Sequence, residues 1–197
     1  IFSSRPVWAL CATGFAVSWN LYIFLSWLPS YFFDVHGMNI SGAGLYSLLP
    51  WITMFLMLNF GGWLNDAVIK KGVSITTTRK VIAGIGLFGS SIMLVFLREV
   101  DSPEMATLLM CCALGICALA YSSIVPNTLD LGPQFSSVLY GIFNTFGTLA
   151  GAIGAPVAGY IVQTTGSYDN VFLVSAIFLI SAGIIYFIFG SGEKIVD

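Results

Sequence analysis

The sequence predicts an all-α integral membrane protein, folded as a bundle of six transmembrane helices. Hydrophobic residues make up 57% of the 197 residues and charged residues only 8%, whereas a soluble domain carries about 25% charged residues. Crossing the hydrocarbon core takes about 20 mostly apolar residues, and runs of about this length occur six times. Both observations exclude a soluble globular domain.

The predicted spans follow one another along the chain and are separated by short polar connections. The connections hold most of the charges and the usual turn-forming residues, as in "KKGVSITTTRK" and "REVDSPE". Residues 1–190 form the predicted bundle, and residues 191–197 form a polar tail that we expect on the cytoplasmic side. The spans are residues 7–33, 42–69, 81–97, 105–125, 138–162 and 171–189.

Six spans place both termini on the same side of the membrane. The basic residues in segments on that side are Arg5, Lys70, Lys71, Arg79, Lys80 and Lys194. Arg98 alone falls on the other side. Because Lys and Arg accumulate in cytoplasmic loops, we expect both termini on the cytoplasmic side or its equivalent in an organelle. This rule does not identify the membrane, so a plastid and the plasma membrane both stay open.

Catalytic and metal-binding patterns are missing from the sequence. The four cysteines lie in apolar runs, and His36 is the only histidine, so no set of ligands has the spacing of a metal or redox site. Gly84-x-Gly86-x-x-Gly89 matches a dinucleotide-binding pattern but lies inside an apolar span, which favours helix packing. We therefore expect no enzyme activity, no cofactor and no metal. The net charge of −2 argues against a nucleic-acid partner.

Charged residues flank the connection between the second and third spans. Asp66 ends a G-x-L-x-D pattern at the membrane edge, where an ionised carboxylate needs a cation or a helix N-terminus. Arg79 or Lys80 can supply that cation, and the pair would hold two helix ends together as a gate latch. The alternative is that these charges only orient the connection.

This pattern resembles the cytoplasmic-loop signature of the major facilitator superfamily. Other segments are similar to its anion:cation symporters, the branch that holds the sialic-acid exporter, vesicular glutamate transporters and plant-type phosphate transporters. The segments that carry the resemblance are "WLPSYF", "LLPWITM", "GGWLNDAVIKKGVSITTTRK", "NTLDLGP", "GIFNTFGTLAGAIG" and "GSGEKIVD". Their order along nearly the whole chain implies the C-terminal half of a twelve-span carrier.

The resemblance implies a secondary active transporter that works by alternating access. The expected substrate is a small anion, first inorganic phosphate coupled to protons or sodium, and next an organic anion such as a sugar acid. The expected partners are the coupling cation, the N-terminal six-span half of the same carrier and the lipid bilayer. Two departures stand out. Val17 replaces an arginine of the glutamate transporters, and Gln134 replaces an arginine near the gate, so that gating would use Asp130 and residues 79–80 differently.

The fifth span separates small and polar residues from bulky ones. Asn144 and Thr148 share one helix face with Gly147, Gly151 and Gly159, whereas the bulky residues lie mostly on the other face. An amide that faces the protein interior either bonds a neighbouring helix or faces a water-filled cavity. In the family that this chain resembles, this span lines the central cavity, which favours Asn144 and Thr148 as substrate contacts.

Two other spans hold candidate substrate contacts. The fourth span contains Tyr121 and Ser122, although a serine can instead bond a carbonyl of its own helix. The first span contains Trp19, Asn20 and Tyr22, whose aromatic members are also typical of an interfacial belt.

The spans hold no charge near their centres. Anion binding and ion coupling require such charges, and the resemblance implies that they lie in the other half of the carrier. A rival reading is a six-span structural subunit without a substrate, in which the glycine stripe is an oligomer interface.

Overall fold

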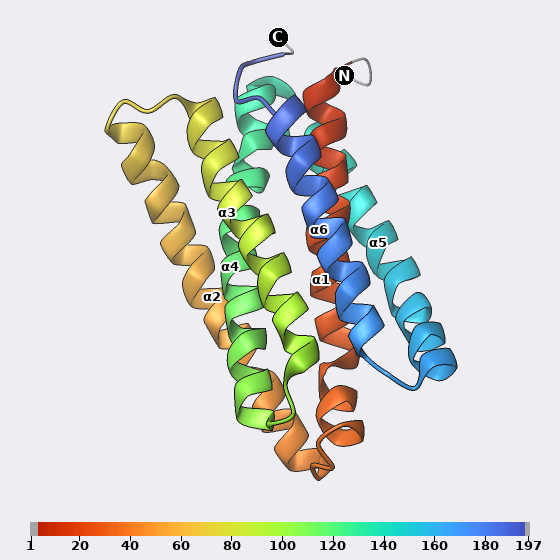
Figure 1. The fold of residues 1–197 in the computed structure, drawn as a ribbon. Coiled ribbons are helices and arrows are strands. Elements are labelled where there is room, and N and C mark those ends of the chain that lie inside the picture. Colours follow the sequence, from red (N-terminus) through yellow and green to blue (C-terminus); the bar gives the residue numbers. More distant parts are fainter. Residues whose placement is uncertain (1–3, 196–197) are drawn as a thin grey trace.

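The computed structural model describes residues 4–195, which form six long helices and no β-strand (Figure 1). Each of the six is long and apolar enough to cross a membrane, which confirms the predicted fold class. The helices are α1 (Arg5–Asp34), α2 (Ile40–Lys70), α3 (Ile75–Phe96), α4 (Pro103–Leu131), α5 (Ser136–Thr165) and α6 (Asp169–Phe189). Two short 3-10 turns, η1 (Leu97–Glu99) and η2 (Pro133–Phe135), stand in the connections.

Local sequence signals set the helix ends. The side chains of Asn39, Ser74 and Ser102 accept hydrogen bonds from backbone N–H groups at the starts of α2, α3 and α4, with distances of 2.7, 3.1 and 3.3 Å. These bonds satisfy donors that the first turn of a helix leaves free. Helix α5 ends at Thr165 and is capped by Gly166, whose φ of 69° is accessible to glycine without strain. Every helix includes most or all of the corresponding predicted run, and α4 continues six residues beyond it to Leu131.

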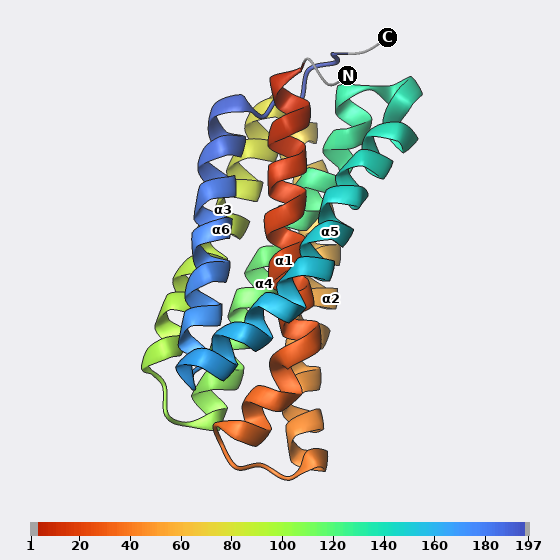
Figure 2. The same ribbon diagram turned by 90° about the vertical axis from the view of Figure 1, so that its right-hand side faces the viewer.

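Both described chain ends and the α2–α3 and α4–α5 connections lie at one end of the bundle, called the terminal end below (Figures 1 and 2). The last described residues are attached there. Gly192 N–H donates to Thr76 Oγ1 at 2.8 Å, and Ile195 N–H donates to the Leu131 carbonyl at 2.8 Å. Residues 196–197 of the predicted tail and residues 1–3 of the predicted bundle lie outside the described residues.

The helices form two triplets, α1–α3 and α4–α6, that make equivalent contacts. The main helix–helix contacts stay the same when each helix is replaced by its counterpart in the other triplet. Helix α1 packs mainly on α5 and α6, and α4 packs correspondingly on α2 and α3, while α3 and α6 pack on each other. Because each triplet has an odd number of helices, the two cross the membrane in opposite directions. This is the arrangement of an inverted repeat, a common building principle of transporters.

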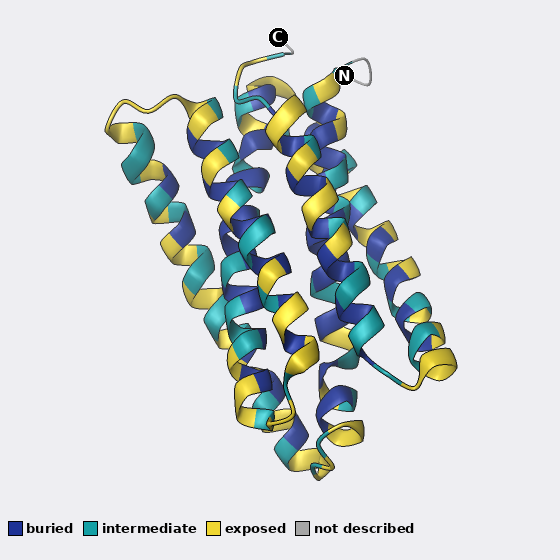
Figure 3. Ribbon diagram, in the orientation of Figure 1, coloured by how far each residue is buried: buried dark blue, intermediate teal, exposed yellow. Residues whose placement is uncertain are grey.

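Burial differs strongly between the helices. Helix α1 is the most buried, and α2 and α5 are the most exposed of the six (Figure 3). The outer helices α2 and α5 therefore carry large surfaces that no other part of residues 4–195 covers.

Small residues set the distance between the central helices. A Cβ atom added at Gly86 of α3 would clash with the backbone of Ala120 in α4, and one added at Gly89 would lie 2.8 Å from Ile116 Cγ2. These glycines serve helix packing, as their position inside an apolar span predicts. By contrast, the nearest atoms to an added Cβ at Gly84 are 4.0 Å away, in the ring of Phe88.

Gly86→Val should lower the thermal unfolding midpoint of the purified membrane protein in detergent. The added side chain meets backbone atoms that cannot rotate away, and overpacking typically costs about 1–3 kcal/mol. Gly84→Val is the matched control, because it makes the same chemical change on the same helix where space is free. Equal midpoints for the two variants would contradict the α3–α4 packing described above.

Candidate functional site

Helix α5 has one buried face and two exposed flanks. The buried face, which packs on α1, includes Phe143, Gly147 and Gly154. On one side of it lies the polar flank, defined by exposed Asn144 and Thr148. On the other side lies the bulky flank, which includes exposed Leu149, Ile153 and Tyr160. The small and polar residues are separated from the bulky ones, as expected from the sequence. However, the face of α5 that packs on α1 lies between the polar flank and the bulky flank.

The glycines of α5 form a packing seam with α1. Added Cβ atoms at Gly147, Gly154 and Gly159 would lie 2.6 Å from Ser18 Oγ, 3.3 Å from the Trp19 ring and 3.0 Å from the Trp27 ring. An added Cβ at Gly151 would clash with the ring of Tyr22. The indole N–H of Trp27 also donates to the Ala155 carbonyl at 3.2 Å. The stripe therefore brings α1 and α5 together and does not itself leave open space.

At the exposed edge of this seam, the side-chain amide of Asn144 has the most donors and acceptors without a partner among the described residues. The Thr148 hydroxyl donates to the Asn144 backbone carbonyl at 2.9 Å, so the hydroxyl hydrogen of Thr148 is already bonded within its own helix. The side-chain amide of Asn144 makes no hydrogen bond to any residue that the structure describes. An amide carries two donor hydrogens and an acceptor oxygen, and the Asn144 residue that carries them is exposed.

Tyrosines from three helices adjoin this edge. Tyr22 of α1 and Tyr121 of α4 are half-buried, and Tyr121 lies within electrostatic reach of Tyr22 and of Tyr140 near the start of α5. The Tyr121 and Tyr140 rings both contact the Phe143 ring, with centroids 6.2 and 6.1 Å apart. Tyr140 was not among the predicted contacts. Its position four residues before Asn144 on the same helix was the available signal.

Three other predicted contacts pack against neighbouring helices, with Trp19 and Asn20 buried and Ser122 half-buried. Trp19 is 3% exposed, and its indole N–H donates to Ser175 Oγ of α6 at 3.2 Å. Asn20 is fully buried and lies beside Cys117 of α4. Ser122 donates to the Leu119 carbonyl at 2.8 Å and stands against Gly61 of α2. Trp19 and Ser122 bond neighbouring helices, and the Asn20 amide is buried without a hydrogen-bond partner among the described residues. None of the three lies on the exposed polar flank, so we do not include them in the candidate site.

A buried ion pair lies at the terminal end. Arg79 Nε of α3 donates to Asp130 Oδ2 of α4 at 2.8 Å, and the side chains are 8% and 13% exposed. Arg79 Nη1 also donates to Asn65 Oδ1 of α2 at 2.9 Å, and Ser123 Oγ donates to the same oxygen at 3.0 Å. One arginine thus connects α2, α3 and α4.

The sequence predicts that Asp66 pairs with Arg79 or Lys80, whereas the structure pairs Arg79 with Asp130. Asp66 is exposed and has no ion pair within residues 4–195, whereas its neighbour Asn65 faces inward to Arg79. Lys80 lies over the Phe187 ring of α6, with Nζ 6.0 Å from the centroid. A one-residue step turns a helix by about 100°, which is why adjacent Asn65 and Asp66 have opposite surroundings.

Another polar contact closes the opposite end of the bundle. Tyr168, which precedes α6, donates its hydroxyl to Asp34 Oδ2 at the end of α1 at 2.7 Å. Burial raises the pKa of Tyr168, and the bond to Asp34 raises it further. Tyr168 therefore stays protonated and keeps its bond to Asp34 over the physiological pH range.

A histidine lies at the same end of the bundle. Burial lowers the pKa of His36 in the α1–α2 connection, and nearby Glu104 and Asp101 oppose this shift.

Asp130→Asn should destabilise the protein far more than Asp66→Asn. Removing one partner of a buried pair leaves an uncompensated charge, which typically costs about 3–5 kcal/mol, whereas an exposed substitution usually stays within about 0.5 kcal/mol. Thermal unfolding of the purified variants in detergent measures the difference. If Asp66→Asn is the more damaging of the two, the pairing of Arg79 with Asp130 is wrong.

Comparison with known proteins gives the chain's relationships. The Major Facilitator Superfamily profile matches residues 1–155. The whole chain is 42% identical to the rice protein named "Probable anion transporter 1, chloroplastic", and covers 37% of it. It is 40% identical over its full length to two Arabidopsis thaliana proteins. These are named "Sodium-dependent phosphate transport protein 1, chloroplastic" and "Ascorbate transporter, chloroplastic", of which it covers 38% and 36%.

The chain thus spans somewhat more than a third of the length of these curated relatives. The profile match covers most of the chain, and it agrees with the six membrane-length helices and their two exchangeable triplets. The chain belongs to the Major Facilitator Superfamily.

Proposed function

We propose that this chain forms one six-span half of a secondary active transporter that moves small anions by alternating access. Membership of the superfamily supports this, and so do full-length similarities to proteins named as anion, phosphate and ascorbate transporters. The partner half would be the N-terminal six-span bundle of the same carrier. The proposal includes no catalytic activity.

The observation that carries the proposal is the exposed side-chain amide of Asn144 on a membrane helix, which has no hydrogen-bond partner within residues 4–195. A polar group that faces lipid without a hydrogen-bond partner is costly. Polar groups within membrane spans therefore face the protein interior or a water-filled cavity. The polar flank of α5 is exposed within residues 4–195, so we infer that it faces a cavity shared with the partner half.

The chemistry of this surface suits one wall of an anion site. The Asn144 amide and the hydroxyls of Tyr22, Tyr121 and Thr148 offer neutral donors to anionic oxygens. Helix centres in this half carry no Lys, Arg, Asp or Glu. The positive charge that balances the anion and the group that couples the cation would then come from the partner half.

The Arg79–Asp130 pair fits a brace better than a gate. A gate between halves must form and break as the halves rock, whereas Arg79, Asp130 and Asn65 all belong to this half. We infer that the network holds α2, α3 and α4 as one rigid body during the movement. Exposed Asp66 remains available for contacts with the partner half, whereas Lys80 is half-buried over the Phe187 ring.

Inorganic phosphate coupled to sodium is the leading substrate proposal. The name of one relative at 40% identity supports it directly. An organic anion is the second candidate, because another relative at the same identity is named an ascorbate transporter. The rival without transport is a six-span structural subunit, for which the polar flank of α5 would be an assembly surface.

We further propose a plastid membrane with both termini on the side equivalent to the cytoplasm. The relatives described above are all named chloroplastic, and the basic residues concentrate at the terminal end.

Uptake by the complete carrier in proteoliposomes tests the function. Radiolabelled phosphate should accumulate when an inward sodium gradient is imposed, and collapsing the gradient should abolish accumulation. Accumulation of radiolabelled ascorbate, without accumulation of radiolabelled phosphate, would favour the organic anion. No uptake of either anion under any cation gradient would contradict the proposal and favour the structural subunit.

Asn144→Ala in the complete carrier should abolish uptake and leave the amount of folded protein unchanged. The substitution removes exposed donors that stabilise no helix contact, so folding loses little while the substrate loses a partner. Gln163→Ala is the matched control, since it removes an exposed amide near the other end of the same helix. Unchanged uptake kinetics for Asn144→Ala would remove this residue from the site.

A further inference from the structure

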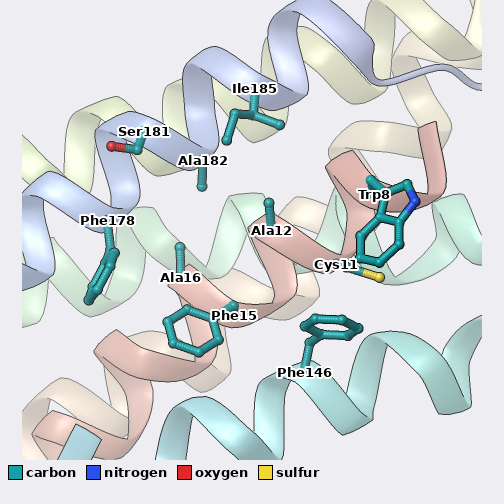
Figure 4. Close-up of a pocket in the computed structure, with 10 residues that line it drawn as sticks. All are labelled: Trp8, Cys11, Ala12, Phe15, Ala16, Phe146, Phe178, Ser181, Ala182 and Ile185. Carbon is teal, nitrogen blue, oxygen red and sulfur yellow. The ribbon is translucent and has the colours of Figure 1, made fainter. Parts of the chain in front are cut away.

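A groove lined mainly by apolar side chains runs along α1 between α5 and α6. It consists of two adjoining cavities of about 320 and 610 Å³, which share Trp8, Ala12 and Ile185. Figure 4 shows the inner part, where Ala12 and Ala16 of α1 form a shallow floor between Phe146 of α5 and the α6 side chains. The Trp8 and Phe146 rings meet edge to face, with centroids 6.1 Å apart.

The groove reaches about half-way across a bilayer. Its lining on α1 extends from Arg5 to Ala16, which corresponds to about 16 Å along a helix. The hydrocarbon core of a bilayer is about 30 Å thick. The groove therefore has the depth of one leaflet, measured from the terminal end.

The groove opens away from the polar flank of α5. Phe146 lines the groove, whereas Asn144 belongs to the polar flank, and two residues of separation place them about 160° apart around the helix. Exposed Ile184 and Ile188 of α6 continue the apolar surface. This side of the bundle has the composition of a lipid-facing surface.

A cation stands at the mouth of the groove. Arg5 is exposed, and its guanidinium carbon lies 5.9 Å from the centroid of the Phe189 ring. No carboxylate forms an ion pair with Arg5 within residues 4–195. Trp8, which is 50% exposed, lies one turn deeper. Arg and Trp are typical anchors at the membrane–water interface, and a guanidinium matches the geometry of a phosphate group.

We propose that this groove binds an anionic phospholipid, with one acyl chain along α1 and the headgroup phosphate on Arg5. The shallow alanine floor makes room for the chain, and the aromatic rings of Trp8 and Phe146 form its wall. The exposed charge of Arg5, which has no carboxylate partner within residues 4–195, selects an anionic headgroup over a zwitterionic one. This inference concerns the lipid-facing side and does not depend on what the protein transports.

Native mass spectrometry of the detergent-purified complete carrier tests the headgroup. The probes are dioleoylphosphatidylglycerol and dioleoylphosphatidylcholine, which differ only in their headgroups. We expect the anionic lipid to be retained about fivefold better, the effect of one basic residue near the membrane surface. Arg5→Gln should remove this preference, and Lys71→Gln, an exposed cation away from the groove, should keep it. Equal retention of both lipids by the unchanged protein would overturn the proposal.

A second pair of variants tests the acyl-chain position. Ala12→Phe fills the floor shared by both cavities and should reduce the retention of both lipids, whereas Ile85→Phe enlarges an exposed side chain of α3 and should not. Retention by Ala12→Phe equal to that of the unchanged protein would refute lipid binding in the groove. Ser181→Phe, at the exposed rim, gives the same test if Ala12→Phe does not fold.

Discussion

Close approach between helix backbones is the constraint on which the rest of this structure depends. In lipid, each spanning helix satisfies its own backbone hydrogen bonds, and helices gain little hydrophobic free energy from meeting one another. Association then relies on van der Waals contact, which small residues permit at short range. Gly86 against Ala120, Gly115 against Thr53 and Gly61 against Ser122 bring α3 and α2 directly onto α4.

The same constraint in the other triplet decides how α5 presents its side chains. Gly147 and Gly154 place the helix against α1, and this contact fixes the rotation of α5 about its own axis. Asn144 consequently lies on one exposed flank and Phe146 beside the groove on the other. Two surfaces with different partners, a polar one and an apolar one, thus follow from a single packing seam.

Polar residues inside the bundle mostly connect helices. Asn65 accepts from Arg79 and from Ser123, and Trp19 donates to Ser175. Asn127 donates to the Tyr186 hydroxyl at 2.7 Å, which attaches α4 to α6. Such contacts stiffen the bundle as a unit, and the proposed transport by rocking two bundles against each other would require stiffness of this kind. The exposed Asn144 amide makes no such contact within the described residues, and in the proposed function it is left for the substrate.

The sequence by itself determined the six spanning helices and the all-α membrane class, because composition and run length are local properties that need no knowledge of neighbours. It also indicated that Asn144 and Thr148 share one side of α5, since helical periodicity places residues around an axis. Only the tertiary structure decided which side of each helix meets protein. It paired Arg79 with Asp130, 51 residues away, in place of Asp66. It also buried Trp19 and Asn20. The physical reason is that a polar side chain's surroundings depend on the rotation and spacing of the adjacent helices, which are set by contacts between distant parts of the chain.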